Sequence, residues 1–104
     1  MNGRQQNVME LVVFKLNPKE DIAVFQEAAT KMTHLLKEEV PGFIERSLLH
    51  TAEKDQWVDV VYWSTMEHAL AAIDVLKSKE EFQSFVSKID MQQTSMYHLM
   101  PMEL

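Results

Sequence analysis

The stretch WVDVVYW, residues 57–63, decides the fold because it is the clearest β-strand of the chain. Its β-branched and aromatic residues favour a strand, and the polar residues just before it form a turn. Phe43–His50, on the other side of that turn, alternates loosely and predicts the partner strand of a hairpin. Side chains alternate between the two faces of a strand, so Trp57, Asp59 and Trp63 share one face.

Helix-start and helix-end signals separate short apolar segments on both sides of this hairpin. The expected elements are a strand at 9–16, a helix from Asn17-Pro18 to Pro41-Gly42, the hairpin, a helix in two pieces opened by capping boxes at 64–67 and 78–81, and a strand at about 94–100. The order β-α-β-β-α-β predicts an α+β domain of the ferredoxin-like type. Such a domain has a four-stranded antiparallel sheet, in the usual order 4-1-3-2, with the helices on one face.

Length and composition fit one domain, residues 8–104, behind a polar end, residues 1–7, that we expect to be disordered. Ten basic against sixteen acidic residues give a net charge of −6 without any Lys/Arg cluster, which argues against nucleic-acid and anionic-membrane partners. The chain has no cysteine, so thiolate metal sites and cysteine nucleophiles are excluded. Apolar runs are too short to span a membrane, and no signal peptide is recognisable, so we expect a cytoplasmic protein.

The sheet face away from the helices is apolar on every predicted strand. A monomer rarely leaves such a patch open to water. The sequence therefore predicts a homodimer whose two sheets pack face to face.

With Pro41-Gly42 before the second strand and WVDVVYW-Ser ending at Ser64, the chain resembles the dimeric α/β-barrel superfamily. Within it, the chain is most similar to the antibiotic-biosynthesis-monooxygenase-like group, over roughly residues 8–100. Haem-degrading members have an Asn in the first strand, a Trp ending the third and a His ten residues later. Here Trp63 matches, residues 9–16 hold no Asn, and Ile73 stands in place of the His, which argues against haem degradation.

The cofactor-independent monooxygenases of the group oxidise phenolic polyketides with O₂. They have an amide residue four positions before the strand-ending Trp, where this chain has Asp59, and a Tyr six positions after it, where this chain has Ala69. The resemblance thus implies a related site with altered chemistry and no cofactor.

Asp59 is the candidate catalytic residue. If the hairpin turn is centred on Glu53, Asp59 lies opposite Ser47, and Glu45 lies one pair further along. We then expect a substrate site formed by Trp57, Trp63, Ser47 and Glu45, with Asp59 as general base toward a weakly acidic C–H or O–H. The alternative is that Asp59 is a structural hydrogen-bond acceptor and both Trp side chains belong to the core. A one-residue slip in register would separate these groups.

Other polar residues allow weaker hypotheses. His98, in the last strand, is a second candidate acid or base, or else a packed interface residue. His50 and His98 lie on opposite edges of the predicted sheet, so they cannot share a metal, and no metal site is expected. Arg46 is expected to point away from the helices toward a partner sheet, to pair there with an acidic residue or bind an anion. The eight methionines are packing material or line an apolar pocket.

These observations favour a small monooxygenase-like enzyme acting on an aromatic or polyketide-like molecule without metal or organic cofactor. The alternatives are a non-catalytic dimer that binds a small apolar ligand, and a purely structural or stress-response dimer.

Overall fold

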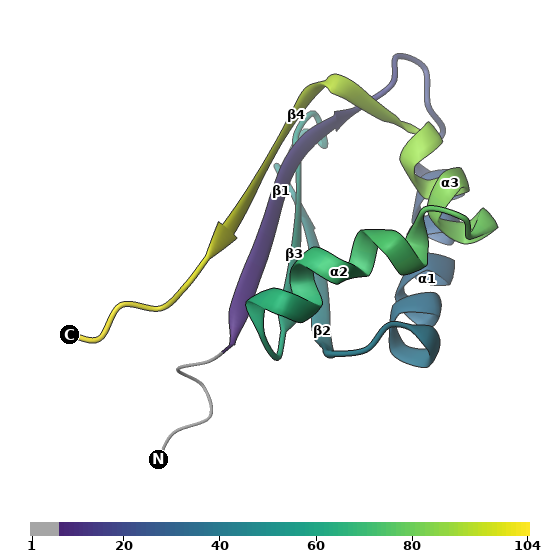
Figure 1. The fold of residues 1–104 in the computed structure, drawn as a ribbon. Helices are drawn as coiled ribbons and strands as arrows, with labels where there is room; N and C mark the ends of the chain where they lie inside the picture. The colour runs from purple at the N-terminus through teal and green to yellow at the C-terminus, as the bar shows by residue number, and fades with distance from the viewer. Residues whose placement is uncertain (1–6) are drawn as a thin grey trace.

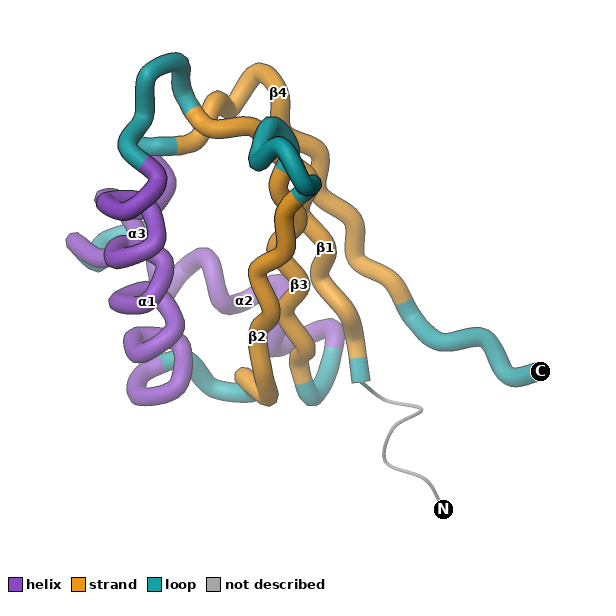
Figure 2. The backbone as a smooth tube through the Cα atoms, turned by 180° about the vertical axis from the view of Figure 1, so that it is seen from behind, coloured by secondary structure: helices purple, strands orange, loops and turns teal. Residues whose placement is uncertain are grey.

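The computed structural model describes residues 7–104 and has two layers, a four-stranded antiparallel sheet and three helices on one of its faces (Figures 1 and 2). Residues 1–6 of the predicted disordered end lie outside the described residues. The elements are β1 (Val8–Leu16), α1 (Ile22–Glu39), β2 (Phe43–His50), β3 (Trp57–Trp63), α2 (Met66–Leu76), α3 (Glu80–Ser87) and β4 (Ile89–Leu99). The strand order β2-β3-β1-β4 confirms the predicted ferredoxin-like topology. Within residues 7–104, no helix combines the length and apolarity needed to cross a membrane.

Helix α1 begins four residues later than the sequence indicates. Its N-cap is Asp21, whose Oδ1 accepts hydrogen bonds from the backbone N–H groups of Ala23 (2.8 Å) and Val24 (3.2 Å). Asn17, the expected cap, instead donates from Nδ2 to the Ser87 carbonyl (2.8 Å) and so fastens the β1–α1 loop to the end of α3. Lys19 then takes a left-handed conformation at φ 67°, which no helical residue adopts.

The turn between α1 and β2 requires a glycine. Gly42 has φ +84°, and its carbonyl accepts a hydrogen bond from Ser64 N–H (2.8 Å) at the start of α2. A Cβ at this position would collide with the imidazole of His68. Gly42 therefore lets the end of β3 and the first turn of α2 pack directly on the α1–β2 turn.

The register of the β2–β3 hairpin differs by one residue from the expected one. His50 pairs with Trp57 across a six-residue loop that the hydrogen bond from Thr51 N–H to the Gln56 carbonyl closes (3.0 Å), so Asp59 lies opposite Leu48. The expectation that Asp59 faces Ser47 is wrong, because the turn is not centred on Glu53.

This slip moves the side chains of β2 from Glu45 onward to the other face, whereas Phe43 still pairs with Trp63. Ser47 and Glu45 therefore lie on the open face of the sheet, away from Asp59, and Arg46 faces the helices. The expectation that Arg46 points toward a partner sheet is wrong for the same reason.

The core fills the space between the sheet and the helices. Burial alternates strictly along β3, which confirms that Trp57, Asp59 and Trp63 share the inward face. Phe25 of α1 is in edge contact with Phe14 of β1 and with Trp57, and it stacks on Phe85 of α3. These aromatic contacts join helices α1 and α3 to the sheet.

Strand β4 is longer than predicted and strongly bent. It begins at Ile89, which the sequence assigns to the preceding helix, and residues 91–94 of β4 face the single residue Phe14 of β1. Such an insertion bends a strand, and Figure 1 shows β4 curving over the end of the sheet. The bend lets the first residues of β4 cover the core near α3, while His98 near its end faces Glu10 of β1.

Candidate functional site

Within residues 7–104, the strands place one guanidinium and two carboxylates on the helix-facing side of the sheet, among apolar neighbours: Arg46 on β2, Asp59 on β3 and Glu10 on β1. Buried charges are costly unless they are paired and hydrogen-bonded, so each needs a physical explanation. The three form two separate clusters, one around Arg46 and one around Glu10.

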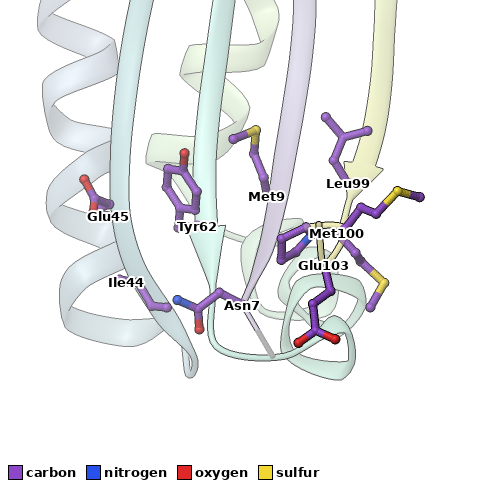
Figure 3. A pocket seen from close by; sticks show the side chains of 10 residues that line it. Asn7, Met9, Ile44, Glu45, Tyr62, Leu99, Met100 and Glu103 are labelled. Atoms are coloured by element: carbon purple, nitrogen blue, oxygen red, sulfur yellow. The ribbon is translucent and has the colours of Figure 1, made fainter. Parts of the chain in front are cut away.

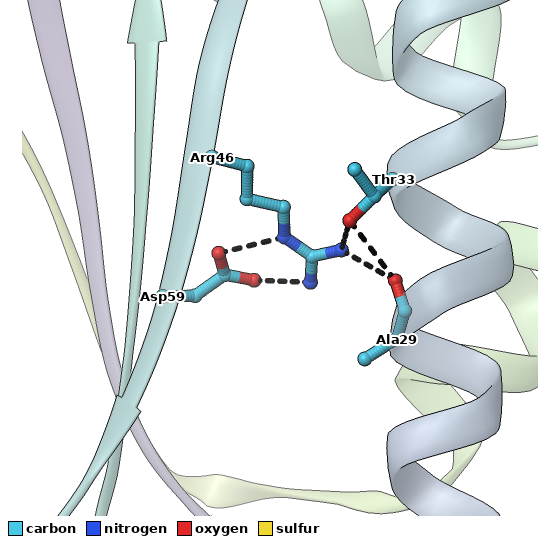
Figure 4. Close-up of polar contacts among 4 residues, drawn as sticks. All are labelled: Ala29, Thr33, Arg46 and Asp59. Carbon is cyan, nitrogen blue, oxygen red and sulfur yellow. Dashed lines mark hydrogen bonds and ion pairs between the residues drawn. The ribbon is translucent and has the colours of Figure 1, made fainter.

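Arg46 and Asp59 form a buried bidentate ion pair (Figure 4). Nε of Arg46 donates to Oδ1 of Asp59 (2.9 Å) and Nη2 donates to Oδ2 (2.7 Å). The Arg46 and Asp59 side chains are 3% and 11% exposed. Nη1 of Arg46 donates to the Ala29 carbonyl (2.9 Å) and to Thr33 Oγ1 (3.0 Å) of α1, and the guanidinium lies 4.8 Å from the Phe85 ring centre. The pair therefore ties β2 and β3 to α1.

This arrangement favours the structural reading of Asp59. The two charge-assisted hydrogen bonds hold the Asp59 carboxylate against the Arg46 guanidinium as a structural acceptor. Ser47, expected as its partner, is on the opposite face, and the partner is Arg46. The catalytic role of Asp59 stays a prediction.

The second cluster joins Glu10, Trp63 and His98, and it lies across three neighbouring strands. Nε1 of Trp63 donates to Oε1 of Glu10 (3.2 Å). Nε2 of His98 lies 3.4 Å from the same oxygen, without the alignment of a hydrogen bond, and it is buried without another partner among the described residues. The contact is therefore an ion pair whenever the imidazole is protonated.

Burial raises the pKa of the Glu10 carboxyl above its usual range. His98 and the hydrogen bond from Trp63 lower the pKa, whereas the negative charge of Asp59 raises it further, and the net result is a rise. The Glu10 and His98 side chains keep 17% and 23% of their surface exposed, so neither is closed off completely from solvent. A titratable group whose pKa is shifted by burial, next to a second titratable group, is typical of catalytic sites.

The open face of the sheet carries a separate hollow of about 920 Å³ near the chain's C-terminal end (Figure 3). Glu45 and Tyr62 line it from β2 and β3, and Met9 lines it from β1. Met100 and Met102 line the opposite side, which places two of the C-terminal methionines against an apolar hollow. Glu45, expected beside Asp59, thus lies on the opposite side of the sheet from it.

Comparison with known proteins gives a consistent answer about the fold. No family model matches the chain, and no curated protein matches it. Solved structures do. A variant of SnoaB, a cofactor-independent oxygenase from Streptomyces nogalater, superposes with a TM-score of 0.77 at 12% identity, over 95% of this chain and 96% of that one. The chain has the antibiotic biosynthesis monooxygenase fold.

Two further structures support the same fold. A proposed antibiotic biosynthesis monooxygenase from Bordetella bronchiseptica has a TM-score of 0.77 at 15% identity, over 95% of this chain and all of that one (100%). Another from Caulobacter crescentus CB15 has a TM-score of 0.71 at 13% identity, over 96% and 93%. At these identities the likeness concerns the monooxygenase fold, and the chemistry has to be argued from the site.

Sequence reasoning missed Glu10, although a signal for it exists. Residues 8, 10, 12 and 14 alternate onto one face of β1, where Glu10 is the one charged residue among Val8, Val12 and Phe14. The same alternation brings Glu10 next to Trp63 once β1 and β3 are paired. It would have marked Glu10 as a buried carboxylate.

Proposed function

We propose that this protein is a cofactor-independent oxygenase that acts on an aromatic, polyketide-like small molecule, with Glu10 as the general base. The observation that carries the proposal is the Glu10 carboxyl, withdrawn from water between the Trp63 indole and the His98 imidazole. A carboxylate with a raised pKa accepts a proton from a weak acid more readily than an ordinary one. The fold shared with an oxygenase that needs no cofactor supports this class of reaction.

The reaction converts an activated methylene into a ketone, R₂CH₂ + O₂ → R₂C=O + H₂O. Glu10 removes one methylene proton, and the resulting carbanion transfers electrons to O₂ and forms a C–O bond. Loss of the second methylene proton and cleavage of the O–O bond give the ketone and water. All four electrons come from the substrate carbon, so the step consumes no external reductant.

Each residue of the cluster has a place in this scheme. The Trp63 N–H fixes the Glu10 carboxylate, and His98, on the more exposed strand β4, donates a proton to the departing oxygen when it is protonated. Asp59 holds Arg46 and thereby the spacing of sheet and α1.

The working form is a homodimer through the open face of the sheet. In the part of the chain that the structure describes, all three helices lie on the other face of the sheet (Figures 1 and 2). Leu49 and Tyr97, from its two edge strands, are about half exposed, at 50% and 51%. Leu11, Val13 and Val60 lie between them on the central strands. An apolar face of this kind is stabilised when a second copy covers it.

Anthrone, a tricyclic ketone with one activated methylene, is the probe that tests the proposed reaction. The wild-type protein should consume one O₂ per anthrone and incorporate one ¹⁸O atom from ¹⁸O₂ into the quinone. Glu10→Gln keeps an acceptor for Trp63 and removes the base, so turnover should fall by about 10²–10⁴-fold. Glu27→Gln, on exposed α1, is the matched control and should leave turnover unchanged. Oxygen uptake no faster than in buffer, or equal turnover in Glu10→Gln, would overturn the proposal.

A non-catalytic ligand-binding dimer is the second candidate, because the Arg46–Asp59 pair removes the free carboxylate expected at the centre of the site. This candidate predicts saturable binding of aromatic probes without oxygen uptake. The same oxygen-electrode measurement therefore separates it from the enzyme.

A further inference from the structure

A groove of about 370 Å³ runs between α1 and the β2–β3 hairpin, away from the Glu10 cluster. Its lining residues come from the inward face of β2, the hairpin loop, the start of β3 and one side of α1: Ile22, Phe25, Gln26, Ala29, Thr30, Thr33, Arg46, Leu48, His50, Lys54 and Trp57. Figure 4 shows Arg46 extending from β2 to α1, where it meets Thr33 and Ala29. The volume falls within the range of small-molecule sites.

The groove is cationic in a chain whose net charge is −6. Among the described residues that line it, none is acidic, whereas Arg46, His50 and Lys54 are basic. Asp59 already neutralises Arg46, so the uncompensated charge comes from Lys54, for which no ion-pair partner is found within residues 7–104. Gln26 and Thr30 add neutral hydrogen-bonding groups. This set of side chains is complementary to an anion.

An aromatic wall lies next to this charge. The His50 and Trp57 ring centres are 5.0 Å apart, and the ring centres of Trp57 and Phe25 are 5.1 Å apart. His50 is held in place because its Nδ1 hydrogen-bonds to the Thr51 carbonyl (2.7 Å). The His50 and Trp57 rings are tilted and the Phe25 and Trp57 rings meet edge to face, so a ligand ring along Leu48 and His50 would add a further aromatic contact to this row.

Lys54 itself occupies an unfavourable backbone conformation at φ 59°, which Asn, Asp or Gly adopts with less strain. A lysine here gives up some local stability and adds a cationic side chain to the lining of the groove. The strained backbone of Lys54 therefore supports a binding role for its positive charge. The lining of the groove is a separate, independent observation.

We propose that this groove binds a small aromatic carboxylate, with the ring against His50, Leu48 and Trp57 and the carboxylate at the Lys54 ammonium. The site goes beyond the proposed oxygenase reaction and does not depend on it. The Arg46 guanidinium, held by Asp59 and α1, lines the inner side of the same groove.

The test titrates the full chain with 2-naphthoate, followed by ¹H–¹⁵N correlation spectra and Trp fluorescence. Binding should saturate and shift the amides of Thr30, His50 and Lys54. Lys54→Asn suits the left-handed conformation, so the melting temperature should hold or rise while the Kd increases roughly tenfold, the effect of one charged hydrogen bond. Lys31→Asn, on the exposed side of α1, is the control and should leave the Kd unchanged.

The neutral isostere 2-naphthamide, of the same shape, should bind roughly tenfold more weakly than 2-naphthoate. Equal affinity for the two probes, an unchanged Kd in Lys54→Asn, or shifts centred on Trp63 or on the open sheet face would overturn the proposal. The naphthoate titration does not depend on oxygen uptake with anthrone. A failure of this groove as a binding site can therefore be told apart from a failure of the oxygenase proposal.

Discussion

Replacing Arg46 with methionine removes the guanidinium from Asp59 and leaves a carboxylate buried on the inward face of the sheet. Both side chains are almost fully buried, and the two hydrogen bonds between them are 2.9 and 2.7 Å long. Removing one partner of a buried pair costs about 3–5 kcal/mol, mostly from the unpaired charge that remains. At about 4 °C per kcal/mol for a domain of this size, the melting temperature should fall by about 12–20 °C.

The double variant Arg46→Met/Asp59→Leu should recover most of this loss. It leaves no unpaired charge, and Ala29 and Thr33 keep their own hydrogen bond, because Thr33 Oγ1 donates to the Ala29 carbonyl (3.2 Å). Replacing a buried ion pair by apolar residues is often neutral or stabilising. The coupling free energy of the double-mutant cycle should therefore be at least about 3 kcal/mol.

The cycle is measured by urea denaturation at one fixed protein concentration, since dimerisation couples stability to concentration. Asp59→Asn is the mild variant and should lose about 1–3 kcal/mol if Asp59 is a structural acceptor. Lys31→Met, in the exposed pair with Glu27, is the control and should change stability by less than about 1 kcal/mol. A coupling near zero, or an Asp59→Asn protein with an undiminished melting temperature and reduced turnover, would refute the structural role and favour the catalytic one.

Three shorter predictions concern the rest of the molecule. Light scattering at micromolar concentration should give about twice 12.1 kDa, and a stable monomer there would contradict sheet-to-sheet dimerisation. Haem titration should produce no sharp stoichiometric Soret shift and no loss of that band on reduction in air, because Trp63 alone of the three expected haem-degrading residues is present. The pKa of Glu10 is higher in the folded state than its ordinary 4.5, so the folded state binds more protons in the window above 4.5. The free energy of unfolding should therefore fall as pH rises through that window. In Glu10→Gln, urea denaturation should show a weaker dependence of the unfolding free energy on pH and a more stable protein at neutral pH. An unchanged pH dependence would contradict the burial of Glu10.

The sequence predicted those features that depend on local pattern. The bounds of Phe43–His50 and Trp57–Trp63 agree with β2 and β3, and the inward face of β3 follows from strict alternation. The strand order follows from the element order, because the ferredoxin-like arrangement is the common solution for it.

The site depended on features that local pattern does not contain. Whether Arg46 or Ser47 faces inward depends on the six-residue hairpin loop and on the register shift between Phe43 and Glu45. A shift of one residue in the pairing exchanges the faces on which these two side chains lie. Asn17-Pro18 has the composition of a helix start, but the tertiary contact of Asn17 with Ser87 competes with capping. Glu10 gains its significance from Trp63 and His98, which are more than fifty residues away along the chain.

Two inward-facing carboxylates thus differ in what surrounds them, and that difference supports the separate roles proposed for them. Asp59 accepts two hydrogen bonds from a guanidinium, so protonating it would break an ion pair that joins β2, β3 and α1. Glu10 accepts one hydrogen bond from a neutral indole and meets a histidine that is charged only when protonated, and burial raises its pKa. In the proposed reaction the general base gains and loses a proton in every cycle, and at Glu10 this would leave the Arg46–Asp59 ion pair intact. The raised pKa of Glu10 and the ion pair of Asp59 with Arg46 together support the proposal that Glu10, and not Asp59, has the acid–base role.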